Sequence, residues 1–291
     1  WKHWMETFPT RDCLVDSNEH DVLMIWQGLG YYNRARRLRK GAISLRGSVW
    51  PRTLNEWLDI PGIGRSTGGS ILSSAFDLPF AILDGNVKRV LSRLLALPIA
   101  PSDAMPLLWQ VSDYLLDKSR PRDFNQALMD LGAMVCIPTK PFCNRCPWQN
   151  SCAAFAGGKV SCYPLKSIRK TVPYEVIGIG IVISNDDQVL IDQRRDEDSL
   201  GGLWEFPGGK QEVGESIQET IARELMEEMA ISVSVGEELI ALDHSYSHKR
   251  LRFVVHLCTV LAGEPKPLAS KELRWVKPTD LENYPFPAAN A

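Results

Sequence analysis

With 291 residues, of which 44% are hydrophobic and 23% charged, the chain has the composition of an ordinary globular protein and enough length for two buried cores. It contains no run of 18 apolar residues, and its first four residues do not have the pattern of a signal peptide. We therefore expect a monomeric cytoplasmic protein without a membrane partner.

The net charge of −2 conceals a division along the chain. Residues 1–170 contain 22 Lys and Arg against 14 Asp and Glu, whereas residues 171–291 contain 11 against 21. A basic region favours a polyanionic partner, because neutralising phosphate groups releases bound counterions. Many solvated helical faces are also basic, so the charge by itself predicts only two domains with different roles.

Residues 1–155 have the apolar periodicity of helices. Apolar residues recur three and four positions apart at 22–26 and 87–95, and turn sequences such as 61–64 separate the segments. No convincing alternating strand pattern occurs in this part of the sequence. The pattern predicts an all-α domain.

Residues 156–172 have the small, polar and basic residues of a linker, and the sequence beyond them is typical of an α+β domain over 173–291. A turn sequence at 185–187 lies between two strand-like runs and predicts a β-hairpin. One amphipathic helix is expected at about 217–229. Further strands are expected around Val233, 254–257 and 273–275.

Four of the seven cysteines lie within 17 residues, separated by six, two and five residues. Soft thiolates this close can hold an iron–sulfur cluster or zinc, although a zinc site usually has two close pairs and a longer spacer. The spacing resembles the [4Fe–4S] loop of the endonuclease III/MutY glycosylases, which implies such a cluster, and zinc stays an alternative. The other cysteines, Cys13, Cys162 and Cys258, are expected to be buried. The implied cluster ligands are Cys136, Cys143, Cys146 and Cys152.

A Pro-Gly-Ile-Gly sequence resembles the helix–hairpin–helix of the same superfamily. Its two glycines allow a tight turn that exposes backbone N–H groups at a helix start, where the helix dipole favours a phosphate oxygen. Taken alone, such a sequence is more often an ordinary turn. The resemblance implies that the DNA-binding residues are Pro61, Gly62, Ile63, Gly64 and Arg65.

Asp84 lies 20 residues after Gly64, at the distance where the superfamily has an active-site aspartate. A carboxylate at this place can stabilise the oxocarbenium-like sugar that is left when a base departs from a flipped-out nucleotide. Alternatively, Asp84 caps the helix that begins near Asn86. The two roles are compatible.

Residues 27–36 and 124–133 are also similar to MutY segments, and all these features occur in the family order. The chain is identified as a member of the MutY-type adenine DNA glycosylases. The resemblance implies an all-α helix–hairpin–helix glycosylase domain with a [4Fe–4S] loop, followed by an α+β Nudix-like domain. It also implies a nucleoid-associated base-excision-repair hydrolase that removes adenine opposite 8-oxoguanine or guanine in double-stranded DNA.

The family's catalytic glutamate, which protonates the departing adenine, belongs to a helix upstream of the point where this sequence starts. Neither Glu6 nor Glu19 has a matching context, and the last residues, 284–290, resemble a motif that normally continues. We therefore expect the chain as given to bind lesion DNA weakly and to excise little or no adenine. An endonuclease III-type enzyme would need a lyase lysine in the hairpin region, where Ser66 stands instead.

The sequence at 209–231 matches the Nudix box except at its last glycine, which is Ala230. Glu224, Glu227 and Glu228 fall on one helical face and could hold Mg²⁺ against a diphosphate. MutY-type enzymes usually keep the fold but lack this box, so Mg²⁺-dependent hydrolysis of 8-oxo-dGTP is an alternative function. Ala230 argues against it, because a glycine there often permits a positive φ.

The segment at 244–248 resembles the Phe-Ser-His loop with which the family recognises 8-oxoguanine, and it favours the lesion-reading role. An aromatic ring beside two polar donors can wedge against a purine and hydrogen-bond to it. The implied contacts are Tyr246, Ser247 and His248. Three interpretations are open: the adenine glycosylase, which is favoured, the Nudix pyrophosphohydrolase, and a DNA-binding module with neither activity.

Overall fold

The chain forms two compact units. One combines Trp1–Arg46 with Thr171–Ala291, and the other is Gly47–Lys170. The sequence predicts two domains joined by a linker at 156–172, and those domain bounds stay a prediction. In the structure, residues 1–46 belong to the same compact unit as the C-terminal part of the chain. The computed structural model describes residues 1–166, 173–198, 200–245 and 249–287.

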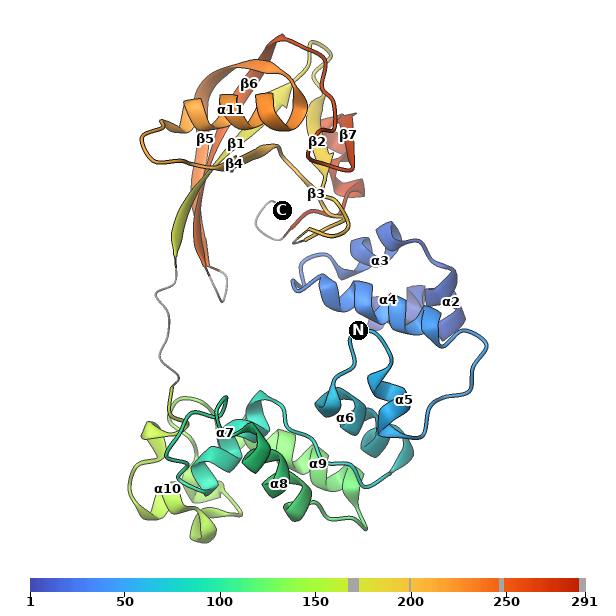
Figure 1. Ribbon diagram of the computed structural model, residues 1–291, viewed down its shortest axis with the longest axis vertical. Helices are drawn as coiled ribbons and strands as arrows, with labels where there is room; N and C mark the ends of the chain where they lie inside the picture. The colour runs from blue at the N-terminus through green and yellow to red at the C-terminus, as the bar shows by residue number, and fades with distance from the viewer. Residues whose placement is uncertain (167–172, 199, 246–248, 288–291) are drawn as a thin grey trace. The chain divides into compact units, whose positions relative to one another are not determined.

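The unit Gly47–Lys170 is helical, as predicted (Figure 1). Its core is formed around Val87, Leu91 and Leu108, which are fully buried. None of the described helices is long and apolar enough to cross a membrane. The helices are α5 (Leu54–Leu58), α6 (Arg65–Phe76), α7 (Gly85–Leu94), α8 (Met105–Leu115), α9 (Pro121–Asp130), η1 (Leu131–Val135), η2 (Cys143–Arg145), η3 (Gln149–Ser151), α10 (Ala153–Ala156) and η4 (Val160–Cys162).

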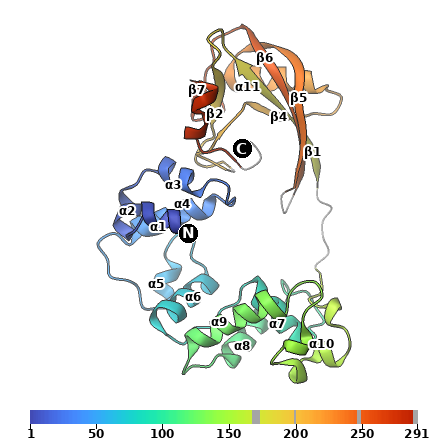
Figure 2. The same cartoon turned by 180° about the vertical axis from the view of Figure 1, so that it is seen from behind.

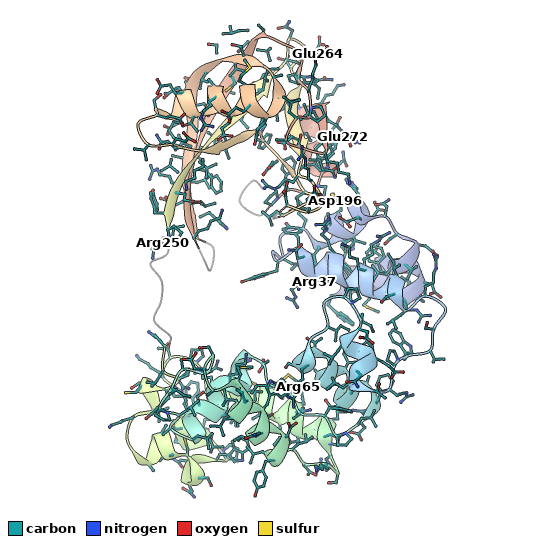
Figure 3. All side chains as sticks on the ribbon, viewed as in Figure 1. Arg37, Arg65, Asp196, Arg250, Glu264 and Glu272 are labelled. Carbon is teal, nitrogen blue, oxygen red and sulfur yellow. The ribbon has the colours of Figure 1, made fainter. Side chains whose placement is uncertain are left out.

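The other unit contains both ends of the chain. In it, short N-terminal helices pack against the C-terminal part of the chain. The Tyr32 hydroxyl donates to the Phe286 carbonyl at 3.0 Å, and Leu23, Tyr32 and Leu203 form a buried cluster. Arg36, which is only 7% exposed, donates to the backbone carbonyl of Asp196, a residue labelled in Figure 3. These helices are α1 (Lys2–Thr7), α2 (Arg11–Asp16), α3 (Glu19–Trp26) and α4 (Asn33–Ser44).

The C-terminal part is a mixed sheet with one helix, α11 (Ile217–Met229), across one face, as both ribbon views show (Figures 1 and 2). The strand order is β3-β2-β1-β6-β5, with β4 paired to β1 and β7 to β2. Strands β1 and β6 are parallel, and the other pairs are antiparallel. The elements are β1 (Tyr174–Ile183), β2 (Val189–Gln193), β3 (Trp204–Glu205), β4 (Gly208–Lys210), β5 (Ser232–Ser245), β6 (Arg250–Ala262), β7 (Glu272–Val276) and η5 (Pro278–Asn283).

Local sequence signals explain how α11 sits on the sheet. Ser216 and Glu219 form a capping box at its start, which satisfies backbone N–H groups of the first turn. Ile221 is fully buried against β1, where a Cβ on Gly178 would come within 2.9 Å of it. The glycine therefore allows the helix to approach the strand closely.

The predicted hairpin, helix and strands of the C-terminal part are confirmed. Ile183 pairs with Val189 across the hairpin, and α11 has the predicted bounds. Cys258 is buried as expected, but Cys13 and Cys162 are exposed, so that part of the expectation was wrong. They lie in the short helical segments α2 and η4, and the spacing of cysteines does not predict which side chains of such segments are exposed.

Candidate functional site

The hairpin between α5 and α6 presents backbone rather than side-chain donors. Gly62 has φ +88°, a conformation that favours glycine, and Gly64 is the N-cap of α6 without a side-chain capping bond. Pro61, Gly62 and Gly64 are exposed, whereas Ile63 is half-buried. The N-terminus of this 12-residue helix therefore has uncapped N–H groups at an exposed turn, which suit an anion.

Arg65, the last of the predicted DNA contacts, is exposed but already engaged. Its guanidinium lies 2.9 Å from the Asp113 carboxylate and 3.9 Å from the centre of the Trp109 ring (Figure 3 labels Arg65). An Arg held between an aromatic face and a carboxylate is oriented before any ligand arrives. It ties the first turn of α6 to α8.

Asp84 is the half-buried N-cap of α7, and its Oδ1 accepts the Val87 N–H at 2.8 Å. The capping role considered from the sequence is thus confirmed. The Ser66 hydroxyl of α6 accepts the Leu83 N–H at 3.1 Å, so the hairpin helix holds the residue that precedes Asp84. A direct bond therefore links the hairpin to the backbone beside the aspartate.

Two residues to which the sequence analysis assigned no role hold the segment before Asp84. The Ser112 hydroxyl donates to the Ile82 carbonyl at 2.7 Å, and the Asn125 amide donates to the Phe80 carbonyl at 2.8 Å. Both side chains are almost fully buried. Because buried polar groups cost free energy unless they are paired, their partners are strongly constrained. No motif marks Ser112, and Asn125 lies in the family-like segment 124–133 without a role that the sequence predicts.

The four clustered cysteines line one cavity, as their spacing predicts. Its empty volume is about 300 Å³, part of it open to solvent. Burial raises the pKa of the Cys143 thiol, and the neighbouring cysteines raise it further; burial also raises the pKa of Cys146. In the described part of the chain, no three His, Cys, Asp or Glu side chains stand close enough to hold one metal ion. The cavity is lined by Cys136, Cys143, Cys146 and Cys152 together with Arg93.

Two arginines of α7 hold the cysteine loop. Arg93, 2% exposed, donates to the carbonyls of Cys136, Ile137, Pro138 and Tyr163 at 2.8–3.2 Å and to the Cys136 Sγ at 3.3 Å. Arg89 donates to the Cys136 carbonyl at 2.8 Å and to Asn86 at 2.9 Å. Helix α7 therefore carries Asp84 at its N-terminus and the anchor of the cysteine loop near its C-terminus.

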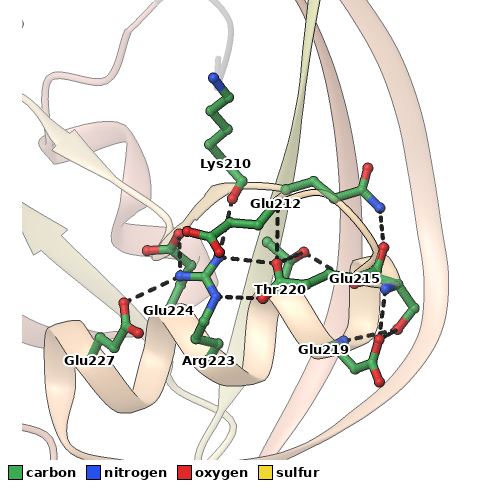
Figure 4. A network of polar contacts seen from close by, with 10 residues as sticks. Lys210, Glu212, Glu215, Glu219, Thr220, Arg223, Glu224 and Glu227 are labelled. Atoms are coloured by element: carbon green, nitrogen blue, oxygen red, sulfur yellow. Dashed lines mark hydrogen bonds and ion pairs between the residues drawn. The ribbon is translucent and has the colours of Figure 1, made fainter.

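The three glutamates considered for Mg²⁺ are not brought together on one ion. Arg223 binds Glu215, Glu224 and Glu227 at 2.7, 3.0 and 3.2 Å (Figure 4). The Arg223 guanidinium, with further hydrogen bonds, lowers the pKa of Glu215 to about 2. Glu228 instead lines a separate cavity near β2 and β3. The geometry therefore does not support a diphosphate-binding Mg²⁺ site.

The predicted 8-oxoguanine contacts, Tyr246, Ser247 and His248, lie outside the described residues. The strands on either side of them, β5 and β6, pair up to Ser245 and Arg250.

Comparisons with known proteins agree with this architecture. Residues 1–111 match the model of the HhH-GPD superfamily of base excision DNA repair proteins, and residues 178–291 match the NUDIX domain. The chain is therefore a base excision repair protein of the helix–hairpin–helix class with a Nudix domain. A solved thermostable thymine-DNA glycosylase is 25% identical, with a TM-score of 0.49, over 54% of this chain and 74% of that one.

Relatives of similar sequence show to which family of base excision repair proteins the chain belongs. An adenine DNA glycosylase of Buchnera aphidicola (subspecies Acyrthosiphon pisum) is 33% identical over 91% of this chain and 74% of its own length. The human adenine DNA glycosylase is 31% identical over 94% of this chain and 60% of its own length. The chain belongs to the adenine DNA glycosylase family.

Proposed function

We propose that this protein removes adenine paired with 8-oxoguanine or guanine in double-stranded DNA by hydrolysing the N-glycosidic bond. The observation that carries the proposal is the placement of Asp84, half-buried at the start of α7 and tied through Leu83 to Ser66 of the hairpin helix. A phosphate bound at the N-terminus of α6 would hold the DNA backbone beside this carboxylate. The protein acts as a monomer on nucleoid DNA in the cytoplasm.

Asp84 supplies negative charge where positive charge develops. As the bond between sugar and base breaks, the electron pair leaves with adenine and the sugar gains oxocarbenium character. A preorganised carboxylate stabilises that charge without having to reorient, because its Oδ1 is held by the Val87 N–H. Water then adds to the sugar to complete the hydrolysis.

A [4Fe–4S] cluster fits the four-cysteine cavity better than one zinc ion does. Each cysteine of a cubane binds a different iron, so the four sulfurs stand farther apart than the ligands of a single ion. This agrees with a cavity that all four cysteines line while no three described metal-ligand side chains could hold one ion. The cluster would stabilise the loop, and Arg93 would offset thiolate charge at Cys136.

The specificity for 8-oxoguanine rests on the loop with Tyr246, Ser247 and His248. An aromatic ring and two polar side chains in a strand connection can contact a damaged purine without taking part in bond cleavage. Variants of these residues should therefore reduce the preference for 8-oxoguanine over guanine opposite the adenine. These variants should still release adenine, because the residues do not take part in bond cleavage.

Adenine release in single turnovers tests the role of Asp84. The protein expressed from its complete reading frame is mixed in excess with a duplex containing adenine opposite 8-oxoguanine, and Asp84→Asn is compared with the wild type. We expect the rate to fall by about 10²–10³-fold while duplex affinity is retained, because asparagine keeps the cap but lacks the charge. A wild-type rate in this variant would refute the assignment.

A further inference from the structure

The C-terminal sheet has one end that α11 does not cover. Strand β6 lies between β1 and β5, and both ribbon views show these three strands continuing past the helix (Figures 1 and 2). Helix α11 begins against Gly178, because a Cβ on this glycine would stand 3.5 Å from the Ile217 carbonyl oxygen. The uncovered strand end therefore consists of residues 174–177 of β1 and the paired residues 250–253 of β6 and 242–245 of β5.

Two arginines lie on one face of this strand end. Leu251 and Phe253 of β6 are buried, at 6% and 8% exposure, whereas Arg250 and Arg252 are exposed. Successive side chains of a strand point to opposite faces of the sheet, so the two arginines share the face opposite to the buried pair. Tyr174, which is 57% exposed, pairs in register with Arg250 and lies on the same face.

Arg250 is fixed by its backbone, whereas its side chain is not engaged. Its N–H donates to the Pro173 carbonyl at 2.9 Å, and on the other side it pairs with Ser245 of β5. Within the described part of the chain, no ion pair or hydrogen bond involves its guanidinium, which lies at the strand end (Figure 3). Arg252 lies 3.6 Å from the Asp243 carboxylate, but an exposed pair of this kind contributes little. Arg250 is therefore a positioned cation that can accept an anion.

The charge of the surrounding sequence makes this cation unusual. Residues 171–291 contain 11 Lys and Arg against 21 Asp and Glu, yet Lys249, Arg250 and Arg252 fall within four positions. Other cations of this part are bound to carboxylates, as Lys271 is to Asp196 at 3.1 Å. An acidic surface repels a polyanion, whereas a local group of cations attracts one. The strand end is therefore the place where this part of the protein favours contact with phosphate.

We propose that Arg250, with Arg252 and Tyr174 beside it, binds a backbone phosphate of the DNA strand that carries the 8-oxoguanine. A guanidinium matches the oxygens of a phosphate with two parallel hydrogen bonds, and an exposed aromatic ring beside an arginine is typical of nucleic-acid surfaces. Arg250 follows His248 by two residues in the sequence. The inference rests on the proposed function and adds a residue that positions the DNA without reading its bases.

Duplex binding at several salt concentrations tests this contact separately from base release. The protein from its complete reading frame is titrated into fluorescent duplexes with 8-oxoguanine or guanine opposite an adenine analogue that cannot be released, and anisotropy is measured. For Arg250→Gln we expect about fivefold weaker binding to both duplexes. The slope of log K against log salt concentration should fall in magnitude by about 0.9, as for one lost phosphate contact. The preference for 8-oxoguanine should stay that of the wild type.

Two further variants make the result specific. Arg250→Lys retains the charge, so it should keep the salt dependence of the wild type and show that the strand end tolerates substitution. Lys277→Gln removes one charge from another exposed position of the same unit and should change neither the affinity nor the slope.

Unchanged affinity and slope in Arg250→Gln would overturn the proposal and would point to an acidic protein as the partner of the strand end. Equal losses in Arg250→Gln and Lys277→Gln would also overturn it, because the effect would then come from net charge alone. The measurement does not involve bond cleavage. A protein that shows the expected binding but releases no adenine would therefore contradict the proposed function and not the role of Arg250.

Discussion

Ala230 stands where the Nudix box has its last glycine, and its backbone conformation lowers the stability of the fold. It ends α11 in the left-handed region, with φ +57° and ψ +34°, where the Nudix box has glycine. A residue with a Cβ pays about 1–2 kcal/mol for this conformation. The positive φ that a glycine often permits at this position is therefore present, although alanine occupies it.

Ala230→Gly should raise the free energy of unfolding by about 1 kcal/mol, because glycine adopts this conformation without the Cβ clash. Urea unfolding curves followed by circular dichroism measure the effect. The matched control is Ala222→Gly in the middle of α11, which should lower stability by about 1 kcal/mol or more. Equal destabilisation by both changes would contradict the account of Ala230.

Ser66 is the second residue whose role can be tested in isolation. Ser66→Ala leaves the Leu83 N–H without its acceptor, at a cost of about 1–3 kcal/mol. We expect slower adenine release with nearly unchanged duplex affinity, since the aspartate loses its positioning while the hairpin backbone stays. Ser66→Thr keeps the hydroxyl and should restore the rate. If threonine failed to rescue, the hydrogen bond would not be the cause.

Helix α7 connects the candidate catalytic aspartate with the cysteine loop. Asp84 caps its N-terminus, while Arg89 and Arg93 bind the cysteine loop from its last turns. Movement of the loop would therefore be transmitted along a rigid helix of ten residues. The proposed cluster would stabilise the position of the aspartate by this route, without taking part in the bond cleavage.

Arg93→Lys tests the connection. Lysine cannot reproduce donation to four carbonyls and a sulfur, so we expect a lower iron content per chain and a stability loss of at least about 2 kcal/mol. Iron assay and thermal unfolding measure these effects. Arg145→Lys, an exposed change in the same loop, should leave both unchanged. Full iron content in Arg93→Lys would show that the loop does not depend on this anchor.

Local signals allowed several elements to be predicted from the sequence. The helix at 217–229 was predicted from its amphipathic pattern, and the structure shows the capping box that starts α11 and the positive φ that ends it. The cysteine cavity follows from spacing within one loop. The roles of Ser112 and Asn125 were not predicted, because their partners lie far away in the chain.

For the whole molecule, the sequence predicts a helical domain followed by an α+β domain. It does not predict that the first 46 residues pack with the second of these domains. Residues 1–46 pack with the C-terminal part through Arg36 and Tyr32, whose partners, Asp196 and Phe286, are more than 150 residues away. Contacts of such long range leave no periodic pattern in the sequence. The family assignment did not depend on them, because its motifs are local.

The most direct test of the proposed function is to identify the base that the protein releases. The protein from its complete reading frame is incubated with duplexes that contain adenine opposite 8-oxoguanine, guanine or thymine, and free bases are separated by chromatography. We expect free adenine from the first duplex, less from the second and none from the third. Release of a different base, or hydrolysis of 8-oxo-dGTP with no free adenine from any duplex, would contradict it.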